Sequence, residues 1–215
     1  MFVRIALSLT ILICSKLEAS TESSLKKAHK DLFRSVSHLG VEFEQTSFRK
    51  LRNKKISRTG SALFSQPNKF KWVYTDKLLG IEEYYYDGSR FSHFVQRENL
   101  LTIYGSDTGL GKELQKIVDL ILNTKDLLES YQPSDVKKLD TMTEVTLNPK
   151  DPMQSDIERI FIKISNKKKY IEQVKLSYQD GNYTAFVFSN PKTSPISASL
   201  YKFNGPKTVK IRTLR

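Results

Sequence analysis

Few side chains in this 215-residue chain have the types and the spacing that catalysis or metal binding requires. The histidines His29, His38 and His93 have no carboxylate and no second histidine at ligand spacing, so we interpret them as structural or surface residues. The single cysteine, Cys14, lies in a segment that we expect to be removed, and the sequence has no G-x-S-x-G motif. The sequence therefore predicts a protein that is not an enzyme, with no catalytic residue, no metal and no cofactor.

Two further segments contain residue types that are common in catalytic and phosphate-binding sites. Glu82, Glu83 and Asp87 are acids near a turn, and we interpret them as solvated strand ends rather than as an acid–base pair. The segment GSDTGLGKE, residues 105–113, has the composition of a phosphate-binding loop, but Glu113 stands where a P-loop has its Mg²⁺-binding Ser or Thr. This segment is therefore predicted to be a loop and not a nucleotide site.

The first nineteen residues have the pattern of a secretory signal peptide. Arg4 supplies a positive charge, the apolar run that follows is shorter than the roughly 20 residues that span a bilayer, and Ala19 offers a small residue for cleavage. Ile13 before Cys14 argues against a lipoprotein signal. We expect cleavage near Ala19 and a single exported, soluble, monomeric domain over residues 20–215, with an uncleaved anchor as the alternative.

The chain is strongly basic, with 35 Lys and Arg against 23 Asp and Glu and a net charge of +12. Two clusters of basic residues lie at predicted hairpin tips, one in residues 49–55 and the other in residues 167–169. Such clusters suit nucleic acid, but an exported protein rarely meets it, so no nucleic-acid partner is predicted. Acidic proteins, anionic lipid headgroups and solubility alone remain as explanations.

Most of the secondary structure that the sequence predicts consists of strands. Apolar residues at spacings of three and four predict one helix from Ser23 to Leu39, stopped by Gly40, and a second from Leu114 to Tyr131. Between and after them, period-two patterns separated by turns predict about ten strands without strand–helix alternation. In one of these strands Phe70, Trp72 and Tyr74 share a face.

An ordered set of short motifs resembles a known family. The segment QPNKFKW at residues 66–72 is followed by YYYDG at residues 84–88, and Phe43-Glu44-Gln45 and Gly60 precede them. The second half adds VTLNPKD, YQDGNYTAFVF and the closing YKFNGPKTVKI. In this order the motifs resemble those of the periplasmic outer-membrane lipoprotein carrier family (LolA).

The resemblance implies an α+β fold: a single, strongly curved antiparallel sheet, a half-open barrel of about ten strands, with helices covering the concave apolar face. It implies a periplasmic protein that holds the acyl chains of lipoproteins, with an inner-membrane lipoprotein-releasing transporter as donor and an outer-membrane acceptor. The apolar and aromatic residues of the predicted strands and helices are compatible with this container and equally with a fully packed core. The residues we assign to lipid binding lie on the strands and the second helix: Phe43, Phe70, Trp72, Tyr74, Leu114, Ile117, Val118 and Ile121. Among them, we expect Phe70 to be partly exposed at the rim and Trp72 to lie deeper.

One position departs from the family pattern. The arginine that the family places before the proline, where it holds a lid shut, is Gln66 here. Glutamine has fewer N–H donors and no charge, so a latch at this position would be weaker. The resemblance thus favours a chaperone that carries lipoproteins from the inner to the outer membrane. The alternative is an interaction or sensing module of the same fold without carrier activity.

Overall fold

The computed structural model describes residues 37–66, 68–76, 80–104, 128–168 and 170–214. The first six strands are β1 (His38–Arg49), β2 (Lys54–Ser65), β3 (Lys69–Asp76), β4 (Gly80–Tyr86), β5 (Phe91–Val95) and β6 (Leu100–Tyr104). The other six are β7 (Tyr131–Lys138), β8 (Met142–Pro149), β9 (Ile157–Ser165), β10 (Tyr170–Tyr178), β11 (Tyr183–Lys192) and β12 (Lys210–Leu214). Three short 3₁₀ turns accompany them: η1 (Lys50–Arg52), η2 (Gln96–Glu98) and η3 (Ala198–Tyr201).

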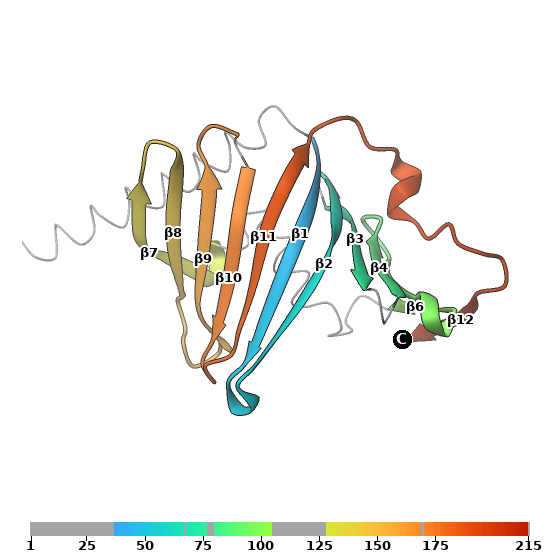
Figure 1. The fold of residues 1–215 in the computed structure, drawn as a ribbon, viewed down its shortest axis with the longest axis horizontal. Coiled ribbons are helices and arrows are strands. Elements are labelled where there is room, and N and C mark those ends of the chain that lie inside the picture. Colours follow the sequence, from blue (N-terminus) through green and yellow to red (C-terminus); the bar gives the residue numbers. More distant parts are fainter. Residues whose placement is uncertain (1–36, 67, 77–79, 105–127, 169, 215) are drawn as a thin grey trace, which may run out of the picture.

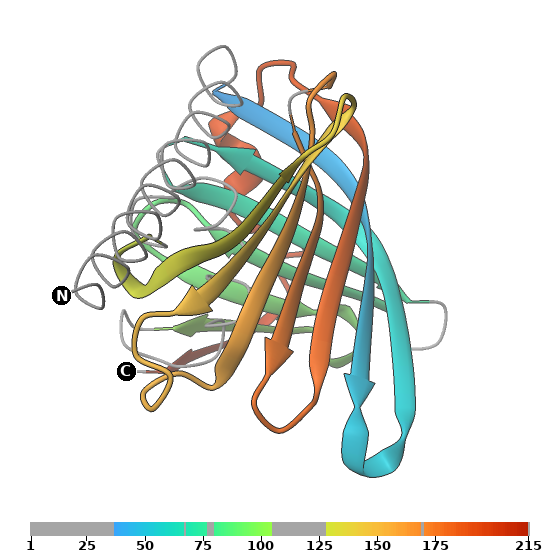
Figure 2. The ribbon, with the colours of Figure 1, turned by 90° about the vertical axis from the view of Figure 1, so that its left-hand side faces the viewer.

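All twelve of these strands belong to one curved sheet (Figures 1 and 2), in the order β12-β6-β5-β4-β3-β2-β1-β11-β10-β9-β8-β7. The strands β1 to β6 form one antiparallel meander and β7 to β11 a second. The antiparallel pairing of β1 with β11 joins the two meanders, and β12 adds to β6 in parallel. The sheet therefore has β7 and β12 as its two edges.

The side-chain alternation along each strand gives the sheet one mainly apolar face, which we call the inner face. Register pairs Phe43 of β1 with Phe188 of β11 on one side and with Gly60 of β2 on the other. Residues directly opposite each other in a sheet share a face, so the buried residues of neighbouring strands form one continuous core. This core runs from Val145 and Leu147 on β8 to the aromatic residues of β3.

A second, smaller core lies on the opposite, outer face of β4 to β6. Tyr85, Phe94 and Leu101 are buried there under Phe203 and Val209, which belong to the segment that leads to β12. The rings of Phe94 and Phe203 are 4.8 Å apart. The C-terminal segment thus crosses the outer face before β12 pairs with β6.

The same segment is also fixed at its start, in η3. Tyr201 is buried, and its hydroxyl is hydrogen-bonded to the hydroxyl of Ser65 at the end of β2. The Ser65 Oγ lies 2.6 Å from Nδ1 of His38. His38, expected at a helix end, is therefore the first residue of β1 and part of a polar contact between three segments.

The predicted fold class is wrong in several respects. The described residues form a single open sheet of twelve strands, not an α+β arrangement of about ten strands with helices covering the concave face. The last of the strands that the period-two pattern predicts, residues 198–203, is instead η3 for its first four residues, and β7 and β12 were not predicted. The sheet is also not wholly antiparallel, because β12 runs parallel to β6.

Strands begin where the two predicted helices were expected to end. The first predicted helix continues through Leu39, but β1 begins at His38, and Gly40 is a strand residue rather than a helix stop. The second continues to Tyr131, but β7 begins at Tyr131, and the described residues just before it, 128–130, are helical. Pro133 lies within β7, where proline is tolerated because β7 is an edge strand. Residues 1–36 and 105–127, and with them the signal peptide, most of both helices and the glycine-rich loop, lie outside the described residues.

Gly60 is the position where the inner face tolerates no side chain. A Cβ placed there would overlap the carbonyl oxygen of Val73 and lie 2.6 Å from the ring of Phe43. The aromatic ring of Phe43 thus occupies the space that a larger residue on β2 would need. Gly40, also within the sheet, is different, because its Cβ would lie 3.2 Å from a methyl group of the flexible Leu63 side chain.

We expect Gly60→Ala to lower the free energy of unfolding by roughly 2 to 3 kcal/mol, since either the β2–β3 pairing or Phe43 must shift. Gly40→Ala is the matched control and should change it by less than about 1 kcal/mol. Urea melts of both variants measure the difference. Equal effects of the two substitutions would show that the close approach at Gly60 is not a constraint.

Candidate functional site

Five aromatic residues form the centre of the inner face, and we call them the aromatic cluster: Phe43, Trp72, Tyr74, Phe186 and Phe188. The ring centre of Trp72 lies 4.3 Å from that of Phe43 and 5.4 Å from that of Phe186. Trp72 is completely buried, and the other four are nearly so. The alternation of β3 places Trp72 and Tyr74 on this face, and the β1–β11 pairing brings the two phenylalanines of β11 to them.

Aliphatic residues continue the inner face away from the aromatic cluster. The strands β8, β9 and β10 contribute Leu147, Ile160, Ile162, Val174 and Leu176, all of them buried. Register pairs Val174 with Ile162 and Ile162 with Val145 in one row across the three strands. Side chains of this kind offer no hydrogen bonds, so their contacts with hydrocarbon are favourable.

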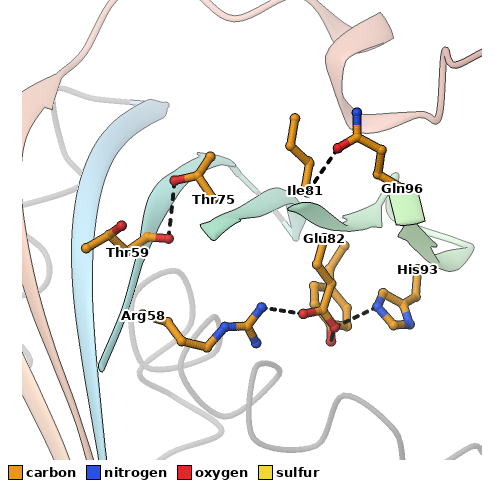
Figure 3. A network of polar contacts seen from close by, with 8 residues as sticks. Arg58, Thr59, Thr75, Ile81, Glu82, His93 and Gln96 are labelled. Atoms are coloured by element: carbon orange, nitrogen blue, oxygen red, sulfur yellow. Dashed lines mark hydrogen bonds and ion pairs between the residues drawn. The ribbon is translucent and has the colours of Figure 1, made fainter. Parts of the chain in front are cut away.

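A group of polar residues interrupts the apolar inner face beside the aromatic cluster. We call Gln45, Arg58, Glu82, Tyr84 and His93 the polar cluster; they come from β1, β2, β4, β4 and β5. The Glu82 carboxylate accepts a hydrogen bond from the Tyr84 hydroxyl at 2.6 Å, and its Oε1 lies 2.9 Å from Nε2 of His93. The guanidinium of Arg58 forms an ion pair with the other carboxylate oxygen (Figure 3).

These contacts determine the charge of the cluster. The hydrogen bond from His93, together with those from Tyr84 and Arg58, lowers the pKa of Glu82 to about 2 against the opposing effect of burial. Burial and the neighbouring Glu82 raise the pKa of the Tyr84 hydroxyl above its ordinary value. At neutral pH Glu82 is therefore a carboxylate that neutralises Arg58, and Tyr84 is a neutral donor. The Arg58 guanidinium also lies 3.8 Å above the ring of Tyr74, which connects the polar and aromatic clusters.

Three buried polar atoms on this face lack a hydrogen-bond partner within the part of the chain that the structure describes. They are Oε1 of Gln45, Nε of Arg58 and Nε1 of Trp72. Buried polar atoms are nearly always paired, because an unpaired one costs about 1 to 3 kcal/mol. Two unpaired donors and one unpaired acceptor beside an apolar surface can bind a carbonyl group and an N–H or hydroxyl group.

Exposure changes along β1 in a regular way. Its inward residues Leu39, Val41 and Phe43 are buried, whereas Gln45 and Ser47 are only half-buried. Gln45 is paired with Arg58 in the β1–β2 register, so the polar cluster lies between the aromatic cluster and the end of the hairpin. Along β1 the inner face is therefore more accessible at the polar cluster than at the aromatic cluster.

The structure brings four of the predicted lipid-binding residues together on the inner face: Phe43, Phe70, Trp72 and Tyr74. The rim position expected for Phe70 is wrong, because this residue is completely buried and its ring packs 6.0 Å from that of Tyr86 and 6.1 Å from that of Phe91. The helix residues Leu114, Ile117, Val118 and Ile121 lie outside the described residues. The binding role of all eight stays a prediction.

Gln66, expected at the latch position, is exposed in the turn after β2. Its main-chain N–H donates to the carbonyl of Ser37 at 3.0 Å. The lid that such a latch would hold lies outside the described residues, so the latch role also stays a prediction.

The sequence analysis missed the polar cluster. The interpretation of Glu82 and Glu83 as solvated strand ends is wrong: both are mostly buried in ion pairs, Glu82 with Arg58 and Glu83 with Lys71. Strand alternation puts Glu82 and Tyr84 on one face, and a β4–β5 hairpin places His93 opposite Tyr84. That pairing could be predicted from the Asp87-Gly88 turn, but the contact with Arg58 also depends on the register of two more strands, β3 and β2.

The described residues include neither a metal site nor a membrane-spanning helix. No group of His, Cys, Asp and Glu side chains there could hold a metal ion. No helix in that part of the chain is long and apolar enough to cross a membrane.

Comparison with known proteins identifies relatives. A family model described as outer membrane lipoprotein carrier protein LolA matches residues 34–204. No curated protein matches the chain. Among solved structures, an uncharacterized conserved protein from Thermus thermophilus is similar with a TM-score of 0.58 and 7% identity, over 90% of this chain and 99% of that one. At this identity the similarity shows a shared fold.

Two other solved structures have lower TM-scores. A LolA superfamily protein from Nitrosomonas europaea has a TM-score of 0.45 and 9% identity, over 85% of this chain and 97% of its own. The Mycobacterium tuberculosis lipoprotein LppX has a TM-score of 0.45 and 11% identity, over 81% of this chain and 96% of its own.

We expect Glu82→Gln to lower the free energy of unfolding by about 2 to 3 kcal/mol at pH 7, since it leaves Arg58 without its counter-charge. Because the pKa of Glu82 is lowered in the folded state, the contribution of its carboxylate is fully present above about pH 4.5 and is lost as the pH falls through about 2. The deficit of the variant should therefore shrink over that range.

Denaturant melts at a series of pH values measure this dependence. Glu158→Gln is the control, because Glu158 is half exposed and pairs with Arg159 on the surface, and it should change stability by less than about 0.5 kcal/mol. A Glu82→Gln deficit that does not vary between pH 7 and pH 2 would contradict the assigned pKa and its cause.

Proposed function

This chain belongs to the LolA family of outer membrane lipoprotein carrier proteins, and on that premise we propose that it binds the acyl chains of lipids or lipoproteins against the inner face of its sheet. The aromatic cluster is the observation that carries the proposal. Its five large rings and the row of aliphatic side chains on β8, β9 and β10 belong to one continuous buried core. Family members are carriers or binding proteins, which supports a non-enzymatic role for this chain.

Burial of hydrocarbon would supply the affinity. Each CH₂ group transferred from water to an apolar surface contributes about 0.8 kcal/mol, so a long acyl chain has a large gross driving force. The aromatic side chains are already buried, so an acyl chain must displace the groups packed against them, and this cost offsets part of the gain. The net affinity would then be moderate, as transfer to a second binder requires.

The polar cluster would hold the polar end of the ligand. Arg58 Nε and Trp72 Nε1 are unpaired donors, and Gln45 Oε1 is an unpaired acceptor, among the described residues. Because Glu82 already neutralises Arg58, the cluster favours a neutral ester or amide group over an anion. An acyl chain linked through an ester or amide would thus lie with its carbonyl at the polar cluster and its hydrocarbon on the aromatic cluster.

We further propose a specific role, in which the chain carries lipoproteins in the periplasm. In this proposal the mature domain after Ala19 receives an acylated protein from an inner-membrane transporter and passes it to an outer-membrane acceptor. The family membership and the apolar inner face support this role. No covalent chemistry is required, because both steps exchange one hydrocarbon environment for another.

Trp72 allows a direct test of acyl binding, because it is the single tryptophan of the chain and lies in the aromatic cluster. A bromine atom quenches tryptophan fluorescence only at short range. We expect an acyl ester brominated along its chain to quench Trp72, and the unbrominated ester to restore the emission by competition.

Soluble bromide is the control, and it should not quench a completely buried Trp72. Circular dichroism must show that the protein remains folded at each ligand concentration. If saturating brominated ester leaves the emission of folded protein unchanged, acyl chains do not lie on the aromatic cluster and the proposal fails.

A further inference from the structure

The β1–β2 hairpin ends in a projecting basic loop, residues 49–55, which we call the hairpin tip. Figures 1 and 2 show it extending beyond the ends of the neighbouring strands. All seven of its residues are exposed, and five are cationic: Arg49, Lys50, Arg52, Lys54 and Lys55. The sequence contains no acidic residue between Glu44 and Asp76, so the parts of both strands next to the tip add no opposing charge.

An apolar side chain stands among these cations. Leu51 lies in the 3₁₀ turn η1 at the apex of the hairpin, between Lys50 and Arg52, and is completely exposed. Ile56, just behind the tip on β2, is also exposed. Because Leu51 is completely exposed, it buries no surface against the described fold, and packing does not explain an apolar residue in this loop.

The tip has a defined conformation. Asn53 reverses the chain in the left-handed region at φ 44°, and its N–H donates to the carbonyl of Lys50 at 3.0 Å. The N–H of Lys50 donates to the side chain of Asn182 at 2.8 Å, which ties the tip to the β10–β11 turn. Behind it, the rings of Phe48 and Tyr183 stack at 5.3 Å. Leu51 is therefore presented at a fixed place and loses little conformational freedom on binding.

We propose that the hairpin tip docks on an anionic lipid bilayer, with its cations at the headgroups and Leu51 inserted at the boundary with the acyl chains. A cationic loop with an apolar apex has the two properties that an anionic bilayer surface rewards. Nucleic acid or an acidic protein would reward the charge but would leave the leucine without a role. The proposal concerns a different surface from the inner face, and it does not depend on acyl binding there.

Docking in this way would set the orientation of the whole molecule. The half-buried residues of β1, Gln45 and Ser47, lie between the aromatic cluster and the tip. A bilayer at the tip would thus lie next to the half-buried end of β1. Hydrocarbon leaving that bilayer would meet the polar cluster before the aromatic cluster.

Co-sedimentation with vesicles tests this proposal. We expect the mature protein to bind vesicles of phosphatidylcholine with phosphatidylglycerol, and to bind pure phosphatidylcholine much more weakly. Arg52→Gln with Lys54→Gln should weaken binding about 25-fold, at about fivefold for each cation near the surface. Leu51→Ser should weaken it about tenfold or more.

The opposite end of the sheet offers matched controls. Leu139, in the β7–β8 turn, is an exposed leucine, and Lys167 and Lys168, in the β9–β10 turn, are exposed lysines. Leu139→Ser and the double change Lys167→Gln with Lys168→Gln carry the same chemistry and should change vesicle binding less than twofold. Thermal melts of all four variants should be unchanged, because every substituted residue is exposed.

Three outcomes would overturn the proposal. The first is an equal loss of binding from the tip variants and the control variants, which would indicate a general effect of charge and hydrophobicity. The second is unchanged binding of Leu51→Ser, which would leave the leucine without a part in docking. The third is tight binding to duplex DNA or polyglutamate with none to anionic vesicles, which would assign the tip to a purely electrostatic partner.

Discussion

The antiparallel pairing of β1 with β11 fixes which side chains face the core across the whole sheet. It joins a meander from the first half of the chain to one from the second, and it sets Phe43 opposite Phe188. A slip of one residue would turn every inward side chain of one meander to the outer face. The aromatic cluster exists only in this register, because Trp72 contacts Phe43 from its own meander and Phe186 from the other. Gly60 permits it by leaving room for the ring of Phe43.

The β1–β2 hairpin arranges three surfaces along one line. Its inner residues begin at the aromatic cluster, pass Gln45 and Arg58 of the polar cluster, and end at the projecting basic tip. Each surface matches a different part of an amphiphile in a membrane: the hydrocarbon, the ester or amide group, and the anionic headgroup layer. One continuous hairpin would thus connect docking at a bilayer with binding of the acyl chain.

Much of this could be predicted from the sequence, but only where the signal was local. The period-two pattern of Phe70, Trp72 and Tyr74 placed these residues on one face correctly, and the motif order indicated the family. The alternation did not reveal that Phe70 is buried, because burial depends on strands paired with β3 from both sides. The Arg58–Glu82 ion pair was missed for the same reason, since it crosses β3. The edge strand β7 was missed because Pro133 suggested a helix end, and β12 because its parallel partner β6 lies far away in the sequence.

The central claim is that the inner face holds an acyl chain, and native mass spectrometry tests it most directly. The full chain would be expressed with its N-terminal segment, purified without detergent and sprayed from a volatile buffer at neutral pH. The account predicts masses above that of the unliganded purified protein that match acylated molecules, and release of ester-linked or amide-linked acyl chains when the complex is dissociated. A folded protein observed only at its own mass, even after incubation with acylated lipids and a bacterial lipoprotein, would contradict it.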